Sequence, residues 1–141
     1  GLTFCAGSFS AGEHNDCVAM AKQFADRTHF VHLRSCYIFP NGNFTEASHL
    51  GGRGHLIDLC RIFEKAEQEG KCNSGRRLPM RVDHGMTFTD EPGGVFDESN
   101  HGHNAGYTLL GRMFAMGQIQ GVIATVDDEL GIDYKQPGFY D

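Results

Sequence analysis

The chain has 141 residues, 40% of them hydrophobic, and a formal net charge of -6, which fits one ordinary globular domain. Because basic residues are few and do not cluster, we expect no nucleic-acid binding. Five cysteines without a CxxC spacing indicate neither a disulfide framework nor a zinc site, and they favour a cytoplasmic location.

The first part of the chain predicts a strand at Leu2–Cys5 and then a helix capped by Asn15. Apolar residues in this helix follow the i, i+3, i+4, i+7 spacing of a face that packs against a sheet. They are Cys17, Met20, Ala21 and Phe24. We find no signal peptide and no run of about eighteen apolar residues, so we expect no membrane segment.

A second apolar run, residues 29–33, predicts another strand. After it, aromatic residues flank Asn41-Gly42, which predicts a small hairpin inserted above the sheet. A second helix follows, and Gly70 is expected to end it. Its predicted core face is Leu56, Leu59, Cys60 and Phe63.

The third apolar run covers residues 78–82. Residues 89–106 then form a long segment rich in Gly, Asp, Asn and His, and loops of this length are often functional lids. We expect two further helices, the last at residues 121–126. The predicted core face of the earlier one is Leu110, Met113, Phe114 and Gly117.

The order strand, loop, helix occurs three times, and the strands are of the buried type. This pattern is typical of βαβ units in a parallel sheet. The predicted fold class is therefore α/β. Active sites of such sheets lie at the carboxyl ends of the strands, which here carry Cys5, His32 and Asp83. Together they suit a borderline divalent ion such as Mn²⁺, Fe²⁺ or Zn²⁺.

The same three residues also have ordinary structural explanations. Cys5 alone is more often a buried apolar residue, His32 fits a core histidine, and Asp83 before a Gly fits a turn. From the pattern alone, both interpretations stay open. Weaker candidates are a His101-x-His103 metal pair and Tyr107, whose phenol is suited to proton transfer.

Five segments, in matching order and spacing from residue 1 to about 126, together resemble the mannonate dehydratase family. Val82, Ser35 and Ala105 depart from the family pattern without removing a candidate ligand. The five segments are Phe4-Cys5-Ala6-Gly7-Ser8, His32-Leu33-Arg34, Glu46-Ala47-Ser48-His49-Leu50-Gly51-Gly52, Met80-Arg81-Val82-Asp83-His84-Gly85 and Asn104-Ala105-Gly106-Tyr107.

The resemblance implies a (β/α)8 TIM barrel of the xylose-isomerase-like superfamily, of which residues 1–141 supply the C-terminal portion of one catalytic domain. It implies a lyase of glucuronate catabolism that converts D-mannonate to 2-dehydro-3-deoxy-D-gluconate and water. Cys5, His32 and Asp83 match ligands of the family's divalent metal, Mn²⁺ or Fe²⁺. A further histidine ligand belongs to the N-terminal part of the barrel, which the chain would need as a partner.

By the same resemblance, Tyr107, His84 and Asp83 surround the reacting carbons, and Arg34 and His49 lie near the sugar acid substrate. We prefer Asp83 as a ligand with Tyr107 and His84 as proton carriers, and leave open which is acid and which is base. We also expect a homo-oligomer. The alternatives are a metal-dependent sugar isomerase on the same barrel, or an inactive barrel fragment that needs a partner segment.

Overall fold

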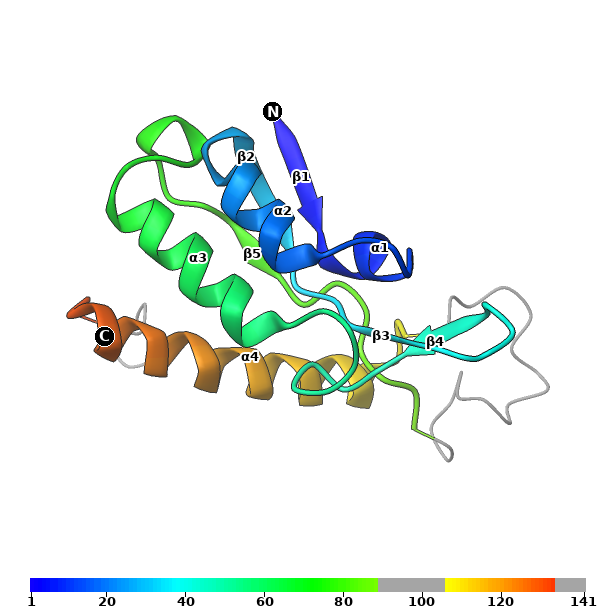
Figure 1. Ribbon diagram of the computed structural model, residues 1–141. Helices are drawn as coiled ribbons and strands as arrows, with labels where there is room; N and C mark the ends of the chain where they lie inside the picture. Colours follow the sequence, from blue (N-terminus) through cyan, green and yellow to red (C-terminus); the bar gives the residue numbers. More distant parts are fainter. Residues whose placement is uncertain (89–105, 134–141) are drawn as a thin grey trace.

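A computed structural model of the chain describes residues 1–88 and 106–133. Its centre is a parallel sheet of three strands in the order β1-β2-β5, with β2 in the middle (Figure 1). The strands are β1 (Leu2–Cys5), β2 (Thr28–His32) and β5 (Met80–Arg81). The predicted α/β class with a parallel sheet is confirmed.

Helices follow each of the three strands, as expected from the βαβ pattern. The first strand leads directly into a short helix that the sequence did not predict. In chain order the helices are α1 (Ala6–Ser10), α2 (Cys17–Phe24), a 3-10 turn (Ala25–Arg27), α3 (Leu56–Gln68), a second 3-10 turn (Asn73–Gly75) and α4 (Leu109–Leu130).

The start of α2 differs from the prediction by one residue. Asp16, not Asn15, is the N-cap, and its Oδ1 accepts hydrogen bonds from the backbone N–H groups of Val18 and Ala19 at 3.0 and 2.9 Å. Asn15 instead donates its side-chain amide to the carbonyl of Phe9 at 2.9 Å. A carboxylate accepts strongly at the positive end of a helix, which favours aspartate at the cap.

The core lies between the sheet and α3. Phe4 from β1 meets Phe63 from α3 edge to face, with ring centroids 5.2 Å apart. The predicted face of α3 is confirmed, since Leu56, Leu59, Cys60 and Phe63 are all buried. The helix ends at Gln68, and Gly70 follows with a φ of +65°, as predicted for a glycine that terminates a helix.

The predicted hairpin is also confirmed. Strands β3 (Cys36–Ile38) and β4 (Phe44–Glu46) pair antiparallel, with Cys36 opposite Glu46. The hairpin projects away from the parallel sheet, on the side to which the carboxyl ends of the strands point (Figure 1). Its base therefore lies near the end of the sheet where a site is expected.

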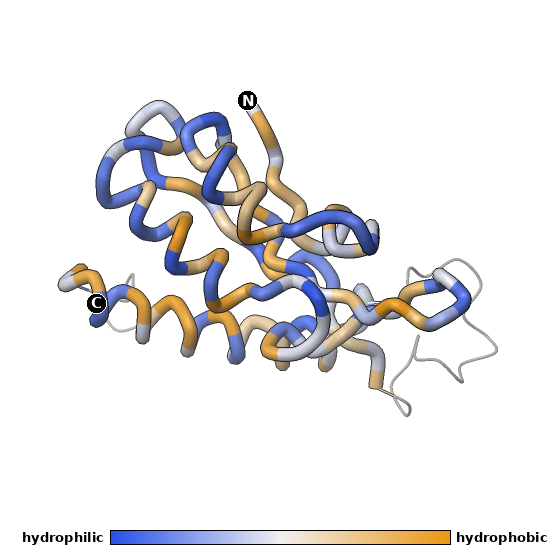
Figure 2. The backbone as a smooth tube through the Cα atoms, in the orientation of Figure 1, coloured by the Kyte–Doolittle hydropathy of each residue, from blue (hydrophilic) through white to orange (hydrophobic). Residues whose placement is uncertain are grey.

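The prediction for the last helices was wrong in two respects. Residues 109–130 form one continuous helix, and its buried face is Gly111, Ala115, Ile119 and Val126 rather than the predicted one. Leu110, Met113 and Phe114 are exposed, as is Gly117. Apolar residues lie along most of α4 (Figure 2), so their spacing could not identify the side that meets the core.

By length and composition alone, α4 could cross a membrane, contrary to the expectation that no such stretch exists. One such helix is weak support for a membrane span, because core helices satisfy the same criteria. Here α4 packs alongside α3 and buries Ala115, Ile119 and Val126 in the common core (Figure 1). The proposed lid, most of residues 89–106, and the His101-x-His103 pair lie outside the described residues.

Candidate metal centre

Three potential metal ligands from three adjacent strands meet at the carboxyl end of the sheet. The parallel register places Cys5, the last residue of β1, beside His32, the last residue of β2. Asp83 follows β5 by two residues. One ligand atom from each residue lies within 4.8 Å of the other two, and His32 Nδ1 is 3.6 Å from Asp83 Oδ2. The sheet thus brings together the three side chains that the sequence pattern singled out.

The ionisation of His32 suits a ligand. Burial lowers the pKa of His32, and this effect outweighs the attraction of Asp83, which raises it. The imidazole is therefore neutral near pH 7, as a metal ligand must be. Thiol, imidazole and carboxylate form a donor set that suits Mn²⁺, Fe²⁺ or Zn²⁺ better than Mg²⁺ or Ca²⁺.

Asp83 has an unusual backbone conformation, and two neighbours hold its side chain. Its φ of +60° lies in the left-handed region, which a residue with a side chain seldom adopts, and such conformations recur at functional sites. Arg81 and Tyr107 both donate hydrogen bonds to Oδ1, the latter over 3.1 Å. Burial raises the pKa of Asp83, but the hydrogen bond from Arg81 and the nearby His32 and His84 bring that pKa below its usual value.

The proton-carrier candidates His84 and Tyr107 lie beside Asp83. Their rings meet edge to face with centroids 4.4 Å apart, and His84 Nε2 is 3.8 Å from Asp83 Oδ2. Tyr107 is 41% exposed, and its hydroxyl donates to the carboxylate. Arg81 also donates to the Tyr107 hydroxyl over 3.2 Å. The arrangement can therefore move protons next to the three-ligand cluster.

Arg34 and Glu46 form an ion pair at the base of the hairpin. Arg34 donates through Nε and Nη2 to the two oxygens of Glu46, at 2.9 and 2.5 Å. His84 Nδ1 lies 2.9 Å from Glu46 Oε1, which connects this pair to the proton-carrier candidates. Arg34, predicted near the substrate, is thus adjacent to the cluster.

Glu46 and Arg81 were not predicted from the sequence to have a role at the site. A signal existed for each. Arg81 lies in the third apolar run, two residues before Asp83, and side chains two residues apart on an extended chain lie on the same face. Glu46 ends the predicted hairpin, whose antiparallel strands return the chain to the level of Arg34.

His49, also predicted near the substrate, is 2% exposed. Its Nε2 lies 3.0 Å from the carbonyl oxygen of Val82, the residue before Asp83. Burial lowers the pKa of His49 more than this hydrogen bond raises it, so the ring is neutral. His49 therefore supports the chain that carries Asp83, and its contact with substrate stays a prediction.

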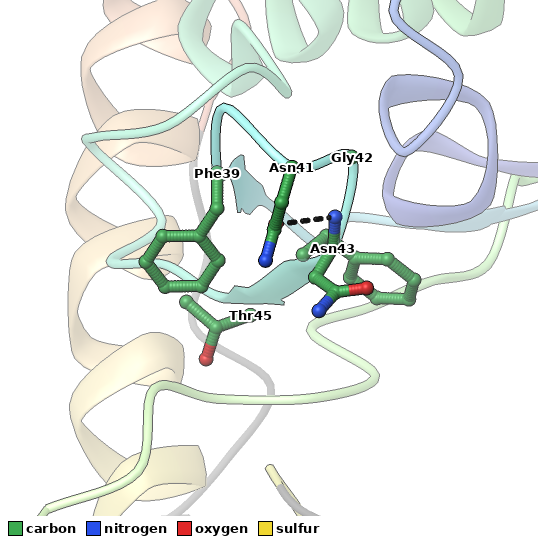
Figure 3. Close-up of a pocket in the computed structure, with 6 residues that line it drawn as sticks. Phe39, Asn41, Gly42, Asn43 and Thr45 are labelled. Carbon is green, nitrogen blue, oxygen red and sulfur yellow. Dashed lines mark hydrogen bonds between the residues drawn. The ribbon is translucent and has the colours of Figure 1, made fainter.

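The hairpin has an open pocket of its own (Figure 3), and the residues that line it are Phe39, Asn41, Gly42, Asn43, Phe44 and Thr45. The side-chain oxygen of Asn41 accepts a hydrogen bond from the backbone N–H of Asn43 at 3.0 Å and shapes the turn. None of the residues that line this pocket is a candidate ligand or proton carrier.

Comparison with known proteins gives a consistent result over nearly the whole chain. The sequence profile of the family described as D-mannonate dehydratase (UxuA) matches residues 1–132. Mannonate dehydratase 2 of Agrobacterium fabrum is 38% identical over 132 residues, and mannonate dehydratase of Saccharophagus degradans is 37% identical over 129. The matches cover 92% and 90% of this chain but 31% of each relative, so the chain spans about a third of their length.

The fold has a counterpart among solved structures. The crystal structure of mannonate dehydratase from Streptococcus suis serotype 2 superposes with a TM-score of 0.69 at 20% sequence identity. The superposition covers all of this chain and 38% of that protein. At this identity, the likeness supports the fold of the chain alone.

Proposed function

Because the chain belongs to the D-mannonate dehydratase family, we propose that it supplies the metal-binding part of an enzyme that removes water from D-mannonate to give 2-dehydro-3-deoxy-D-gluconate. One observation carries the proposal. The ligand atoms of Cys5, His32 and Asp83 converge within 4.8 Å at adjacent strand ends, with His84 and Tyr107 next to the carboxylate.

In this proposal Cys5, His32 and Asp83 hold a divalent ion, Mn²⁺ or Fe²⁺. The neutral His32 and the ionised Asp83 fit the requirement that ligands be deprotonated. A bound ion would act as a Lewis acid toward the oxygens of a sugar acid. Arg34 lies near the same place, paired with Glu46, and its contact with the substrate stays a prediction.

The elimination needs two proton transfers, and we assign both to residues of this chain. A base takes the proton from C2, and an acid gives a proton to the hydroxyl that leaves C3, so that one water departs in total. His84 and Tyr107 contact each other and Asp83, and they are the two candidates. Asp83 serves as a ligand, because coordination lowers the basicity of a carboxylate.

We further propose that the chain works as the C-terminal portion of a single (β/α)8 barrel. Strands β1 and β5 are the outer strands of the sheet and have open edges among the described residues. The apolar residues on the outer side of α4, with Leu109 73% exposed, form a surface of the kind that other parts of a protein cover. The homo-oligomer and the cytoplasmic location stay predictions.

The test uses the complete protein that carries this chain, loaded with Mn²⁺ and incubated with D-mannonate. We expect a 2-keto-3-deoxy acid whose mass is lower than that of the substrate by one water. Asp83→Ala should lose both metal and activity, whereas Asp58→Ala, which changes an exposed carboxylate on α3, should keep both. A product of unchanged mass would point to an isomerase, and no consumption of D-mannonate would refute the proposal.

A further inference from the structure

Glu46 lies at a junction between the hairpin and the candidate proton carriers. It is the last residue of β4, and its side chain is only 7% exposed. Oε1 contacts both Arg34 Nη2 and His84 Nδ1, while Oε2 accepts from Arg34 Nε. One buried carboxylate thus binds both a guanidinium and an imidazole, which share Oε1.

The contact with Glu46 places a proton on Nδ1 of His84. A carboxylate can only accept hydrogen bonds, so Nδ1 must be the donor over the 2.9 Å that separates the two atoms. In a neutral imidazole with a proton on Nδ1, Nε2 has a lone pair. That Nε2 faces the cluster, 3.8 Å from Asp83 Oδ2.

Two glycines keep the arrangement tightly packed. A Cβ on Gly7 would overlap the side chain of Arg34. A Cβ on Gly106, whose φ is +90°, would lie 2.9 Å from both Glu46 Cγ and His84 Nδ1. The carboxylate, the guanidinium and the imidazole therefore have little space for another arrangement, and the side chains are held in one geometry.

We infer that Glu46 is a positioning residue that fixes the tautomer and orientation of His84, so that Nε2 is the nitrogen that exchanges a proton with the substrate. The inference rests on the proposed function for its catalytic consequence. The opposing explanation is that Glu46 serves only to pair with Arg34 and hold the hairpin. The two explanations differ in what happens to His84 when the charge of Glu46 is removed.

The test replaces Glu46 with glutamine in the complete protein. Glu46→Gln keeps the shape and one acceptor oxygen, but it offers an amide N–H₂ that disfavours a proton on His84 Nδ1. We expect kcat to fall about 100-fold, in the range that a misplaced general acid or base causes, with KM within about threefold of wild type. Metal content should stay unchanged. Glu46→Asp, which retains the carboxylate, should recover part of the loss.

A control and a spectroscopic readout complete the experiment. The control is Glu129→Gln. Glu129 forms another bidentate ion pair, with the exposed Arg61, and its replacement should leave kcat unchanged. Nitrogen-15 NMR of the histidine rings, recorded with diamagnetic Zn²⁺, should find the proton of His84 on Nδ1 in wild type and on Nε2 in Glu46→Gln. This readout does not need turnover, so it decides the role of Glu46 even if D-mannonate is not the substrate.

Two outcomes would overturn the inference. One is a wild-type spectrum with the His84 proton on Nε2 alone, which also decides the matter if Glu46→Gln does not fold. The other is a Glu46→Gln protein with wild-type kcat, whatever its tautomer.

Discussion

The hydroxyl of Tyr107 donates a hydrogen bond to Asp83 Oδ1 over 3.1 Å, and so connects the segment before α4 with the end of β5. Asp83 uses this oxygen for Tyr107 and Arg81, while Oδ2 faces His32. The carboxylate is thus shared between two tasks. One oxygen is held by protein donors, and the other is directed at the proposed metal ligands.

Tyr107→Phe should separate these two tasks. Removal of the hydroxyl takes away a proton carrier but leaves all three ligands, so we expect normal metal content with kcat lowered by about 100-fold. Metal analysis and steady-state kinetics on the complete protein would measure both. Tyr37→Phe, at an exposed tyrosine of the hairpin, is the matched control. Full activity in Tyr107→Phe would contradict the role given to this residue.

Cys5→Ala should weaken metal binding, because the thiol is one of three converging ligand atoms. We expect a loss of affinity of at least about 100-fold, above the effect of changing a residue that only supports a ligand. Metal titration of the complete protein would measure it. Cys17→Ala changes a buried cysteine on α2 and should bind metal as wild type does. Equal affinities in the two variants would exclude Cys5 as a ligand.

Gly106→Ala should lower stability and activity by more than the strain of a positive φ alone would cause. Gly106 and Gly131 both have positive φ, but only Gly106 has atoms of Glu46 and His84 within 2.9 Å of where a Cβ would lie. Gly131→Ala should therefore cost about 1–2 kcal/mol of stability, the penalty of a side chain in the left-handed region, and spare activity. Gly106→Ala should cost about 2–4 kcal/mol and lower kcat, because the new methyl group displaces His84. Thermal unfolding and kinetics would compare them, and equal effects would argue against the close packing.

Glu64 on α3 should make stability depend on pH. Burial raises the pKa of Glu64 to about 7, helped by Asp127 and Glu67 and opposed by Arg77. Because the folded pKa exceeds the unfolded value near 4.5, its contribution is full below pH 4.5 and is lost as the pH rises through about 7. Glu64→Gln should therefore gain stability over wild type from pH 4.5 to 8, by about 1–3 kcal/mol.

Urea unfolding of the complete protein at several pH values would measure this gain. Glu129→Gln is expected to behave in the opposite way. The hydrogen bond from Arg61 lowers the pKa of Glu129, so its contribution is present above the unfolded pKa and is lost as the pH falls through the folded one. A Glu64→Gln difference that does not change with pH would show that Glu64 ionises freely in the folded protein.

The sequence predicted those parts of the fold in which polar and apolar residues are clearly separated. The face of α3 is an example, since Leu59 and Phe63 are apolar and the opposite side is charged. In α4 both sides are apolar, so Ala115 and Ile119 could not be distinguished from Met113 and Phe114 as the residues that meet the core. Spacing carries no information about the buried side of such a helix.

The part of the candidate site that lies at the ends of the parallel strands could be predicted from the sequence. A parallel sheet necessarily aligns Cys5 with His32, and β5 adds Asp83 at the same edge. The contact of Glu46 with His84 depends instead on the angle at which the hairpin lies against the segment after β5. That angle is set by packing between distant segments, which no local pattern encodes.

The ion pair between Arg34 and Glu46 joins two residues on either side of the hairpin. It joins the two strands where they leave the body of the protein. A Cβ atom placed on Gly42, at the tip, would have no described atom within 4 Å. Changes at the tip of the hairpin should therefore not alter the candidate site at its base. Lengthening, shortening or tagging the tip should be tolerated, which makes it a suitable attachment point for a fluorescent label on a working protein.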